Sequence, residues 1–297
     1  MTDNRRAMLL MLAFVSLWAL VEAMAAHVLR AYSPYQVVWT RYAVHLALML
    51  LVWGWREPTS LWRTRRPVFQ LARSLLMLGM PACWIIGMQL GVRATTVMAL
   101  FWLSPLFILL LARLFLRERV PASIWVASVI ACAGALLLHP PGAMPPLHLL
   151  LLPLGMGLCF SLYVVMTRSL RSETTRANLF YTALGVFVAL SPAMPGIWVA
   201  PLPSDLLAMV GVGVLGYATL YLLDRMAAAA PVSVSAPFSY LQIPVTLGVA
   251  WVAGMGHGLS DRRLALGLLL IGAAALYVWA REARVAVTDA VSMRPTQ

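Results

Sequence analysis

Long apolar runs, separated by short segments that carry polar residues and arginines, fill almost the whole chain. Each run is close to the ~20 residues that a helix needs to cross the hydrocarbon core of a bilayer. The runs lack the alternation of a membrane barrel strand, and a backbone in lipid must satisfy its own hydrogen bonds, so helices are expected. We predict ten spans, at 7–27, 34–55, 69–90, 95–114, 122–138, 147–167, 178–194, 204–223, 232–254 and 262–280.

The composition supports this pattern. Hydrophobic residues make up 62% of the 297 residues, charged residues make up 11%, and the mean hydropathy is +0.86. Such a chain has too little polar surface to cover a water-soluble globule. The fold class that we predict is therefore an all-α integral membrane protein.

The net charge of +12 is distributed by loop and does not gather on one face. All but five of the 22 arginines lie at the chain ends, in alternate loops or just inside the bordering helices. Positive residues concentrate on the cytoplasmic side of membrane proteins. We therefore expect an even number of spans and both termini in the cytoplasm, in the cytoplasmic (inner) membrane of a bacterium. The same distribution argues against a nucleic-acid-binding protein.

The two halves of the chain repeat one another weakly. A shift of 139 residues places Pro105 on Pro244, Phe101 on Tyr240 and Tyr42 on Tyr181. We therefore divide the chain into repeats at 7–138 and 147–280 and a cytoplasmic tail at 281–297. Because each repeat holds five spans, the second enters the membrane from the opposite side, and such inverted repeats enclose a site that can open to either face.

Two segments carry a resemblance to a known family. They read ALFWLSPLFILLLARLFLRERV, followed by IWVASVIACAGALLL, and SAPFSYLQIPVTLGVAWVAGMGHGLSDRRLALGLLLIGAAAL. Both resemble the end of an EamA domain, and the chain is identified as a member of the drug/metabolite transporter superfamily. The resemblance implies two EamA-type domains of five helices and secondary transport of a small metabolite, commonly export.

One departure from the family pattern concerns the end of the long helix. The family usually has Gly-Glu there, the first half has Arg117-Glu118, and the second half has Gly256-His257. We interpret the sequence Arg117-Glu118-Arg119 as a cytoplasmic stop that holds the end of the fourth helix at the membrane surface.

Charged residues inside the spans are the first candidates for substrate binding or coupling. Glu22 and Arg41 are predicted at similar depths near the outer side of the first two helices, where they could pair. The alternative is a purely structural ion pair, or an Arg41 that reaches the interface. His45 lies one helical turn beyond Arg41 on the same face, and it is either a packed residue or a proton carrier.

Aromatic and amide side chains form the second set of candidates. Aromatic rings with a polar edge can stack on an organic substrate and orient it, although many such residues only pack or anchor helices. The candidates are Trp18, Trp84, Gln89, Trp102, Tyr163, Tyr217, Tyr221, Tyr240 and Gln242. Pro81, Pro105, Pro237 and Pro244 are expected to interrupt helices beside the cavity.

The residues that are missing argue against an enzyme. The chain contains no lysine, which excludes a Walker A loop and a pyridoxal Schiff base in their usual forms. Glu22 is essentially the one carboxylate that we place inside a span, so a catalytic carboxylate cluster is not expected. The three cysteines lie in different spans without metal-ligand spacing, and no metal or cofactor is predicted.

The sequence therefore predicts a secondary transporter that works by alternating access. The cavity residues suit a zwitterionic or amphipathic metabolite, and the substrate that we predict is an exported amino acid or a compound derived from one, such as a metal chelator. Uptake or exchange of a nucleoside-like metabolite is the alternative, and a non-transporting receptor or assembly factor is the rival class. The expected partners are a small-molecule substrate, the bilayer and protons, and the oligomeric state stays open.

Overall fold

The computed structural model describes residues 3–57, 59–142, 144–253 and 262–292, with side chains as far as residue 285. Within these ranges the regular structure is entirely helical. The first half contains α1 (Asp3–Val28), α2 (Pro34–Met49), η1 (Leu50–Gly54), α3 (Thr59–Trp62), α4 (Pro67–Gln89), α5 (Ala94–Phe101), α6 (Ser104–Phe115) and α7 (Ala122–Leu138). The second half contains η2 (Leu147–Leu150), α8 (Leu151–Ser169), α9 (Thr175–Leu190), η3 (Ser191–Ala193), α10 (Met194–Ile197), α11 (Pro203–Ala229), α12 (Val232–Ser235), η4 (Ala236–Leu241), α13 (Gln242–Val252) and α14 (Arg262–Ser292).

The expected membrane-spanning helices are present. Within the described residues, 9 helical segments are long and apolar enough to cross a bilayer, and the shorter apolar helix α7 occupies the predicted fifth span. Two helices run further than predicted. α11 continues beyond 223 to Ala229, and α14 continues beyond 280 to Ser292. The apolar run after Arg225 extends α11, so Asp224 belongs to a membrane helix, which corrects the expectation of a single intramembrane carboxylate.

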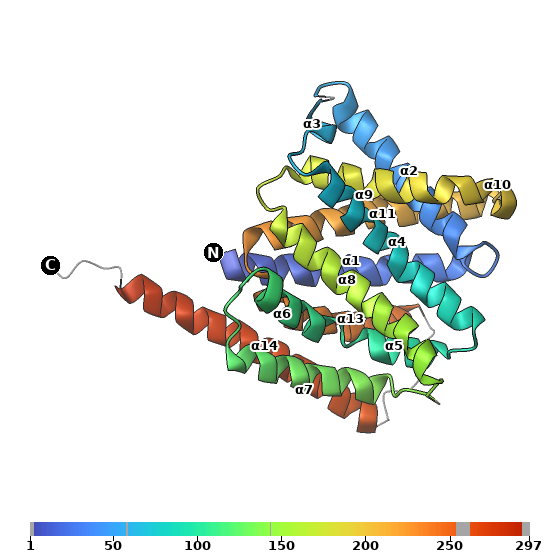
Figure 1. The fold of residues 1–297 in the computed structure, drawn as a ribbon. Helices are drawn as coiled ribbons and strands as arrows, with labels where there is room; N and C mark the ends of the chain where they lie inside the picture. The colour runs from blue at the N-terminus through green and yellow to red at the C-terminus, as the bar shows by residue number, and fades with distance from the viewer. Residues whose placement is uncertain (1–2, 58, 143, 254–261, 293–297) are drawn as a thin grey trace.

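The start of α1 and the end of α14 lie on the same side of the bundle (Figure 1). The Asn4 amide donates a hydrogen bond of 2.7 Å to Oε2 of Glu282, which joins these two helices. We call this side the terminal face, and it also carries the segments 55–57, 59–66, 116–121, 170–174 and 230–231. The opposite side, which carries 29–33, 90–93, 139–142 and 198–202, is the far face.

The contacts of the first half are repeated in the second with the halves exchanged. α1 packs along α11, and its counterpart α8 packs along α4. α2 likewise contacts α11, while α9 contacts α4. α7 and α14 lie side by side and pair with each other (Figure 1). This exchange is the arrangement expected when two related five-helix repeats face one another.

The helix breaks follow the repeated prolines. The fourth span changes from α5 to α6 just before Pro105, and the ninth span changes from η4 to α13 just before Pro244. A proline cannot donate the intrahelical hydrogen bond, so a break there leaves carbonyl groups free. Beside this break, the first residue of α6 also joins the two halves, because the carbonyl of Ser104 accepts 2.9 Å from the Ser161 hydroxyl.

Loop contacts on each face also join the halves. On the far face the Tyr32 hydroxyl donates 2.7 Å to Oδ2 of Asp205, and this bond raises the pKa of the Tyr32 phenol above its ordinary value. On the terminal face Arg176 forms an ion pair with Glu57. The loops after the first and seventh spans thus meet on one face, and the loops after the second and sixth meet on the other.

Gly134 and Gly267 permit the close approach of α7 and α14. A Cβ atom on Gly134 would lie 2.8 Å from the carbonyl oxygen of Gly267 and 3.1 Å from Ile271. Gly134→Ala should therefore force the helices apart and cost about 1–3 kcal/mol, as overpacking generally does. Gly272→Ala is the matched control on α14, because its Cβ would meet nothing within 4 Å. Melting of both purified variants in detergent tests this, and equal melting temperatures would contradict the close approach.

Candidate functional site

A cavity of about 300 Å³ lies between the two halves. α1, α2, α4, α5 and α6 contribute to its wall from the first half, and α8, α11, η4 and α13 contribute from the second. Its aromatic lining residues are Phe14, Trp18, Trp84, Phe101, Trp102 and Phe160. Its charged and polar lining residues are Glu22, Arg41, Ser104, Ser239 and Gln242. Such a mixture of apolar walls with a few polar groups is typical of a site for a small organic molecule.

The cavity extends toward the far face and ends short of the terminal face. Its lining includes Leu29 and Pro34, at the far-face ends of the first two spans. On the other side the lining stops at Phe14 and Leu223. Between these residues and the terminal face, α1 and α11 place side chains that are completely or almost completely buried. These are Met8, Met11 and Met226, which we call the methionine plug.

The Glu22 carboxylate is held by residues of both halves. Oε1 accepts 2.9 Å from the indole Nε1 of Trp18, and 2.9 Å from the side-chain amide of Gln242. Oε2 accepts 3.5 Å from the Thr246 hydroxyl. Trp18 lies one turn before Glu22 on α1, whereas Gln242 and Thr246 lie on α13. The three donors stabilise the carboxylate as an acceptor at the cavity wall.

The Arg41 guanidinium is buried and short of hydrogen-bond partners. Its side chain packs against α11, where a Cβ on Gly216 would lie 2.4 Å from Nε. The central carbon lies 4.9 Å from the ring centroid of Trp18, a cation–π contact. Nε and Nη2 are buried without an acceptor among the described residues. Because a buried unpaired charge is costly, this group provides a ready site for an anion from the cavity.

Glu22 and Arg41 do not form the ion pair that their depth suggested. The ion pairs found among the described residues join other groups, and Trp18 contacts both side chains instead. The indole N–H reaches Glu22 because the two residues are one helical turn apart, and the ring face is then turned to Arg41. The two charges therefore share one cavity as separate groups.

The other candidates divide between several places. Trp84, Trp102 and Gln242 line the cavity with Trp18, Glu22 and Arg41. Tyr240 is completely buried against Trp102, with ring centroids 6.2 Å apart. Gln89 is exposed at the far-face end of α4 and lies outside the lining of the cavity.

His45 lies behind the cavity wall. It is 2% exposed and meets Tyr42 and Tyr217 edge-on, with ring centroids 4.9 and 5.8 Å away. Tyr217 and Tyr221 line a second cavity, of about 560 Å³, that reaches the terminal-face segment 171–176. His45 therefore contacts a lining residue of the second cavity and lines neither cavity itself.

A buried polar network beside the second cavity was not expected from the sequence. Arg73, one of the arginines that the charge pattern places just inside a bordering helix, is 1% exposed inside α4. Nη2 donates to Oε1 of Gln70 at 2.9 Å and to the carbonyl of Asn178 at 2.6 Å. The Gln70 amide donates 2.6 Å to Oδ1 of Asn178, whose amide donates 2.8 Å to Oδ1 of Asp224. Two amides thus connect a buried cation to a buried carboxylate.

Tyr163 belongs to this network rather than to the central cavity. Its ring centroid lies 5.0 Å from the central carbon of Arg73. Arg73 also donates to the hydroxyls of Thr167 and Thr182, at 2.9 and 3.0 Å. The network therefore ties α4 of the first half to α8, α9 and α11 of the second. The sequence carries one signal that would have indicated this network. An arginine interrupts an apolar helix, and Gln70 lies one turn before it.

Comparison with known proteins gives a consistent picture. A sequence model described as the EamA-like transporter family matches residues 5–139. The riboflavin transporter of Rhizobium johnstonii is 31% identical over 232 residues, which cover 75% of this chain and 73% of that protein. The S-adenosylmethionine uptake transporter of Rickettsia bellii is 24% identical over 220 residues, which cover 73% and 74%. A solved crystal structure with 19% identity matches with a TM-score of 0.81 over 94% of this chain and 98% of that one, which shows a shared fold.

Proposed function

Since the chain belongs to the EamA-like transporter family and is a multi-pass membrane transporter rather than an enzyme, we propose that it carries a small amphipathic metabolite with a flat ring, a cationic group and a carboxylate. The observation that carries this proposal is the cavity in which Nε and Nη2 of Arg41 lack an acceptor among the described residues and Glu22 stands on the other side of Trp18.

Each part of such a substrate has a counterpart in the cavity wall. The carboxylate of the substrate binds the free nitrogens of Arg41, since a charge-assisted hydrogen bond is among the strongest available. The ammonium or sulfonium group binds near Glu22. The flat ring stacks on Trp84 or Trp102. S-Adenosylmethionine, named for one set of relatives, has all three features, and amino-acid-derived compounds with an aromatic ring share them.

The proposed mechanism is alternating access between the repeats 7–138 and 147–280. The charge distribution supports a cytoplasmic terminal face, with both termini inside, in the cytoplasmic membrane of a bacterium. The cavity that extends toward the far face is then the externally open site. The family resemblance implies export, whereas the S-adenosylmethionine relatives are named for uptake, so uptake is the direction to test first. Protons are the proposed coupling ion, with Glu22 as their binding group and His45 as the second candidate.

The test is flux into proteoliposomes that contain the purified full-length protein. Labelled S-adenosylmethionine, riboflavin and an aromatic amino acid are compared, with and without an imposed pH gradient. We expect saturable movement of S-adenosylmethionine and of the aromatic amino acid, which both carry a cation and a carboxylate, and acceleration of this movement by the pH gradient. Riboflavin, which carries neither charge, is expected to move more slowly. A receptor or assembly factor would bind without moving any of the three, and that result would refute the proposal.

A further inference from the structure

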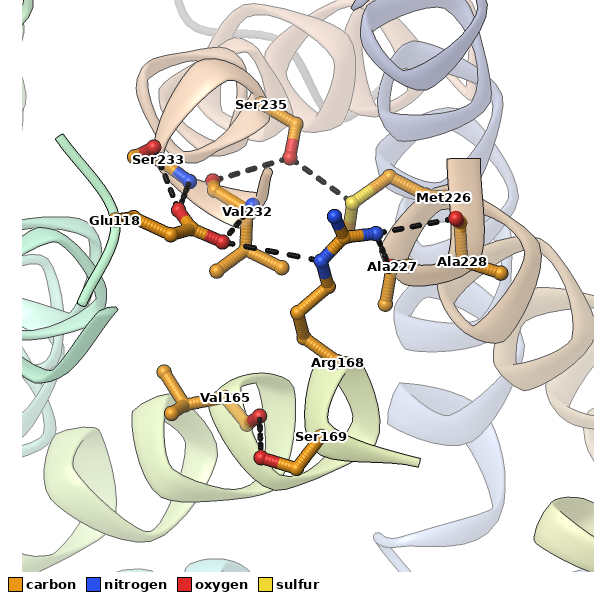
Figure 2. A network of polar contacts seen from close by, with 10 residues as sticks. All are labelled: Glu118, Val165, Arg168, Ser169, Met226, Ala227, Ala228, Val232, Ser233 and Ser235. Atoms are coloured by element: carbon orange, nitrogen blue, oxygen red, sulfur yellow. Dashed lines mark hydrogen bonds and ion pairs between the residues drawn. The ribbon is translucent and has the colours of Figure 1, made fainter. Parts of the chain in front are cut away.

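We interpreted Glu118, at the end of the fourth span, as part of a cytoplasmic stop signal. In the structure its side chain also makes contacts that this interpretation did not include. Glu118 is bonded to the first residues of the ninth span (Figure 2). Oε1 accepts 3.2 Å from the backbone N–H of Val232. Oε2 accepts 3.1 Å from the backbone N–H of Ser233 and 2.7 Å from its hydroxyl. The carboxylate thus satisfies backbone donors that the start of a helix leaves unpaired.

Arg168 completes this arrangement from the end of the sixth span. Its Nη1 donates 2.7 Å to the carbonyl of Ala227 and 3.1 Å to that of Ala228, in the last turn of α11. Its Nε lies 3.8 Å from Oε1 of Glu118 (Figure 2). A cation at the carbonyl end of a helix interacts favourably with the helix dipole. Both side chains are only about a tenth exposed, so water screens the pair less than it would at the open surface.

The backbone is strained in order to place Glu118. Arg117, two residues after the end of α6, has φ 55°, in the left-handed region that usually requires glycine. A left-handed non-glycine residue costs about 1–2 kcal/mol. The turn also lets the N–H of Glu118 return to the carbonyl of Ala112 at 3.2 Å. The unfavourable backbone conformation at Arg117 therefore sets the direction in which the Glu118 side chain points.

These contacts cross between the halves directly over the methionine plug. Glu118 comes from the first half, whereas Arg168, Val232 and Ser233 come from the second. Met226 of the plug accepts a hydrogen bond of 2.9 Å at its sulfur from Ser235, in the same short helix that Glu118 contacts. A passage from the cavity to the terminal face has to separate these elements.

The two repeats carry different residues at the position of Glu118. The shift of 139 residues that relates the repeats places Glu118 on His257, which lies outside the described residues. The second repeat therefore has no carboxylate where the first has Glu118. The contacts of Glu118 close the terminal face, and the other repeat has no acidic residue at the corresponding position. This difference favours the conformation that is closed at the terminal face over the one that is closed at the far face.

We propose that Glu118 and Arg168 form a latch that keeps the terminal face closed at rest and releases it during transport. The proposal rests on alternating access in the proposed function. Loss of the latch shifts the population toward a state that is open at the terminal face, without any substrate being needed. The latch therefore determines which side of the membrane the unloaded carrier faces.

The test measures which face is open in the full-length protein in lipid nanodiscs. Cys83, Cys132 and Cys159 are first replaced by serine or alanine. A single cysteine is then placed at Met11 in the plug, or at Ala25 in the cavity wall, and labelled with a polar maleimide. In the parent we expect slow labelling at position 11 and fast labelling at position 25.

Glu118→Gln keeps the size of the side chain but removes its charge. We expect labelling at position 11 to rise about tenfold, the scale of one lost charge-assisted hydrogen bond, and labelling at position 25 to slow. Glu57→Gln is the matched control, because Glu57 is also a terminal-face carboxylate paired with an arginine but lies away from the plug. Equal labelling of Glu118→Gln, the control and the parent would overturn the latch.

A second variant decides the question if Glu118→Gln does not fold. Ser233→Ala removes only the 2.7 Å hydroxyl contact to Glu118 and should raise labelling at position 11 by a smaller factor. No increase in Ser233→Ala would then refute the proposal. The measurement requires no transported compound. Failure of the transport assay together with a change in labelling would reject the proposed substrate and leave the latch in place.

Discussion

Arg41→Gln is expected to abolish transport of a carboxylate-bearing substrate while leaving the protein folded. Nε and Nη2 of Arg41 are buried without acceptors in the part of the chain that the structure describes, so the free protein gains little from the charge. The substrate gains a charge-assisted hydrogen bond from it, worth about 1.5–3 kcal/mol, or roughly a 10- to 100-fold change in affinity. Glutamine keeps part of the packing against Gly216 and cannot supply the positive charge.

Two measurements on this variant separate binding from folding. The melting temperature should stay the same or rise, because an unpaired buried cation has been removed. Affinity should fall for the carboxylate substrate, but not for its methyl ester, which has no anion to lose. If the acid and the ester lose affinity equally, or if the variant melts much earlier than the parent, Arg41 is a structural residue.

The second large effect is expected at the buried network. Arg73→Gln removes hydrogen bonds to Gln70, Thr167, Asn178 and Thr182, and it removes the buried positive charge that Asn178 links to the Asp224 carboxylate. Breaking a buried charge pair by deleting one partner costs about 3–5 kcal/mol. We therefore expect a large fall in melting temperature and in the yield of folded protein.

The double variant tests the reason for this loss. Arg73→Gln combined with Asp224→Asn removes both charges, and it should recover part of the stability that the single change loses. Arg66→Gln, an exposed position just before α4, is the control and should be neutral. If the double variant is no more stable than Arg73→Gln, the loss comes from the hydrogen bonds of the arginine and not from an unpaired carboxylate.

The sequence could predict the spans and the breaks because both depend on local information. Hydropathy marks each membrane helix, and the repeated prolines mark the breaks before Pro105 and Pro244. The depth of Glu22 and Arg41 followed from their positions along their helices, and both line one cavity. The side chains that contact Glu22 and Arg41 depend on how α1, α2 and α13 are rotated about their axes. No local sequence pattern gives this rotation.

Arg73 and Asp224 were misplaced for a related reason. A charge near the end of an apolar run is usually a loop residue, and the positive-inside pattern supported that interpretation. Burial of Arg73 depends on three helices, α4, α8 and α9, that meet around its guanidinium. Glu118 was understood as a surface stop because its partners, Val232 and Arg168, lie far away in the sequence.

The position of Trp18 has a consequence for how a ligand is recognised. One indole donates its N–H to Glu22 and offers its face to Arg41, so neither charged group can be occupied without a response from the ring. Sites that share a movable element are thermodynamically linked, and the linkage acts equally in both directions. The cationic and anionic ends of a ligand are then sensed jointly. A fragment that carries only one of the two charges therefore binds with a smaller free energy than the same charged group contributes when it is part of the whole molecule.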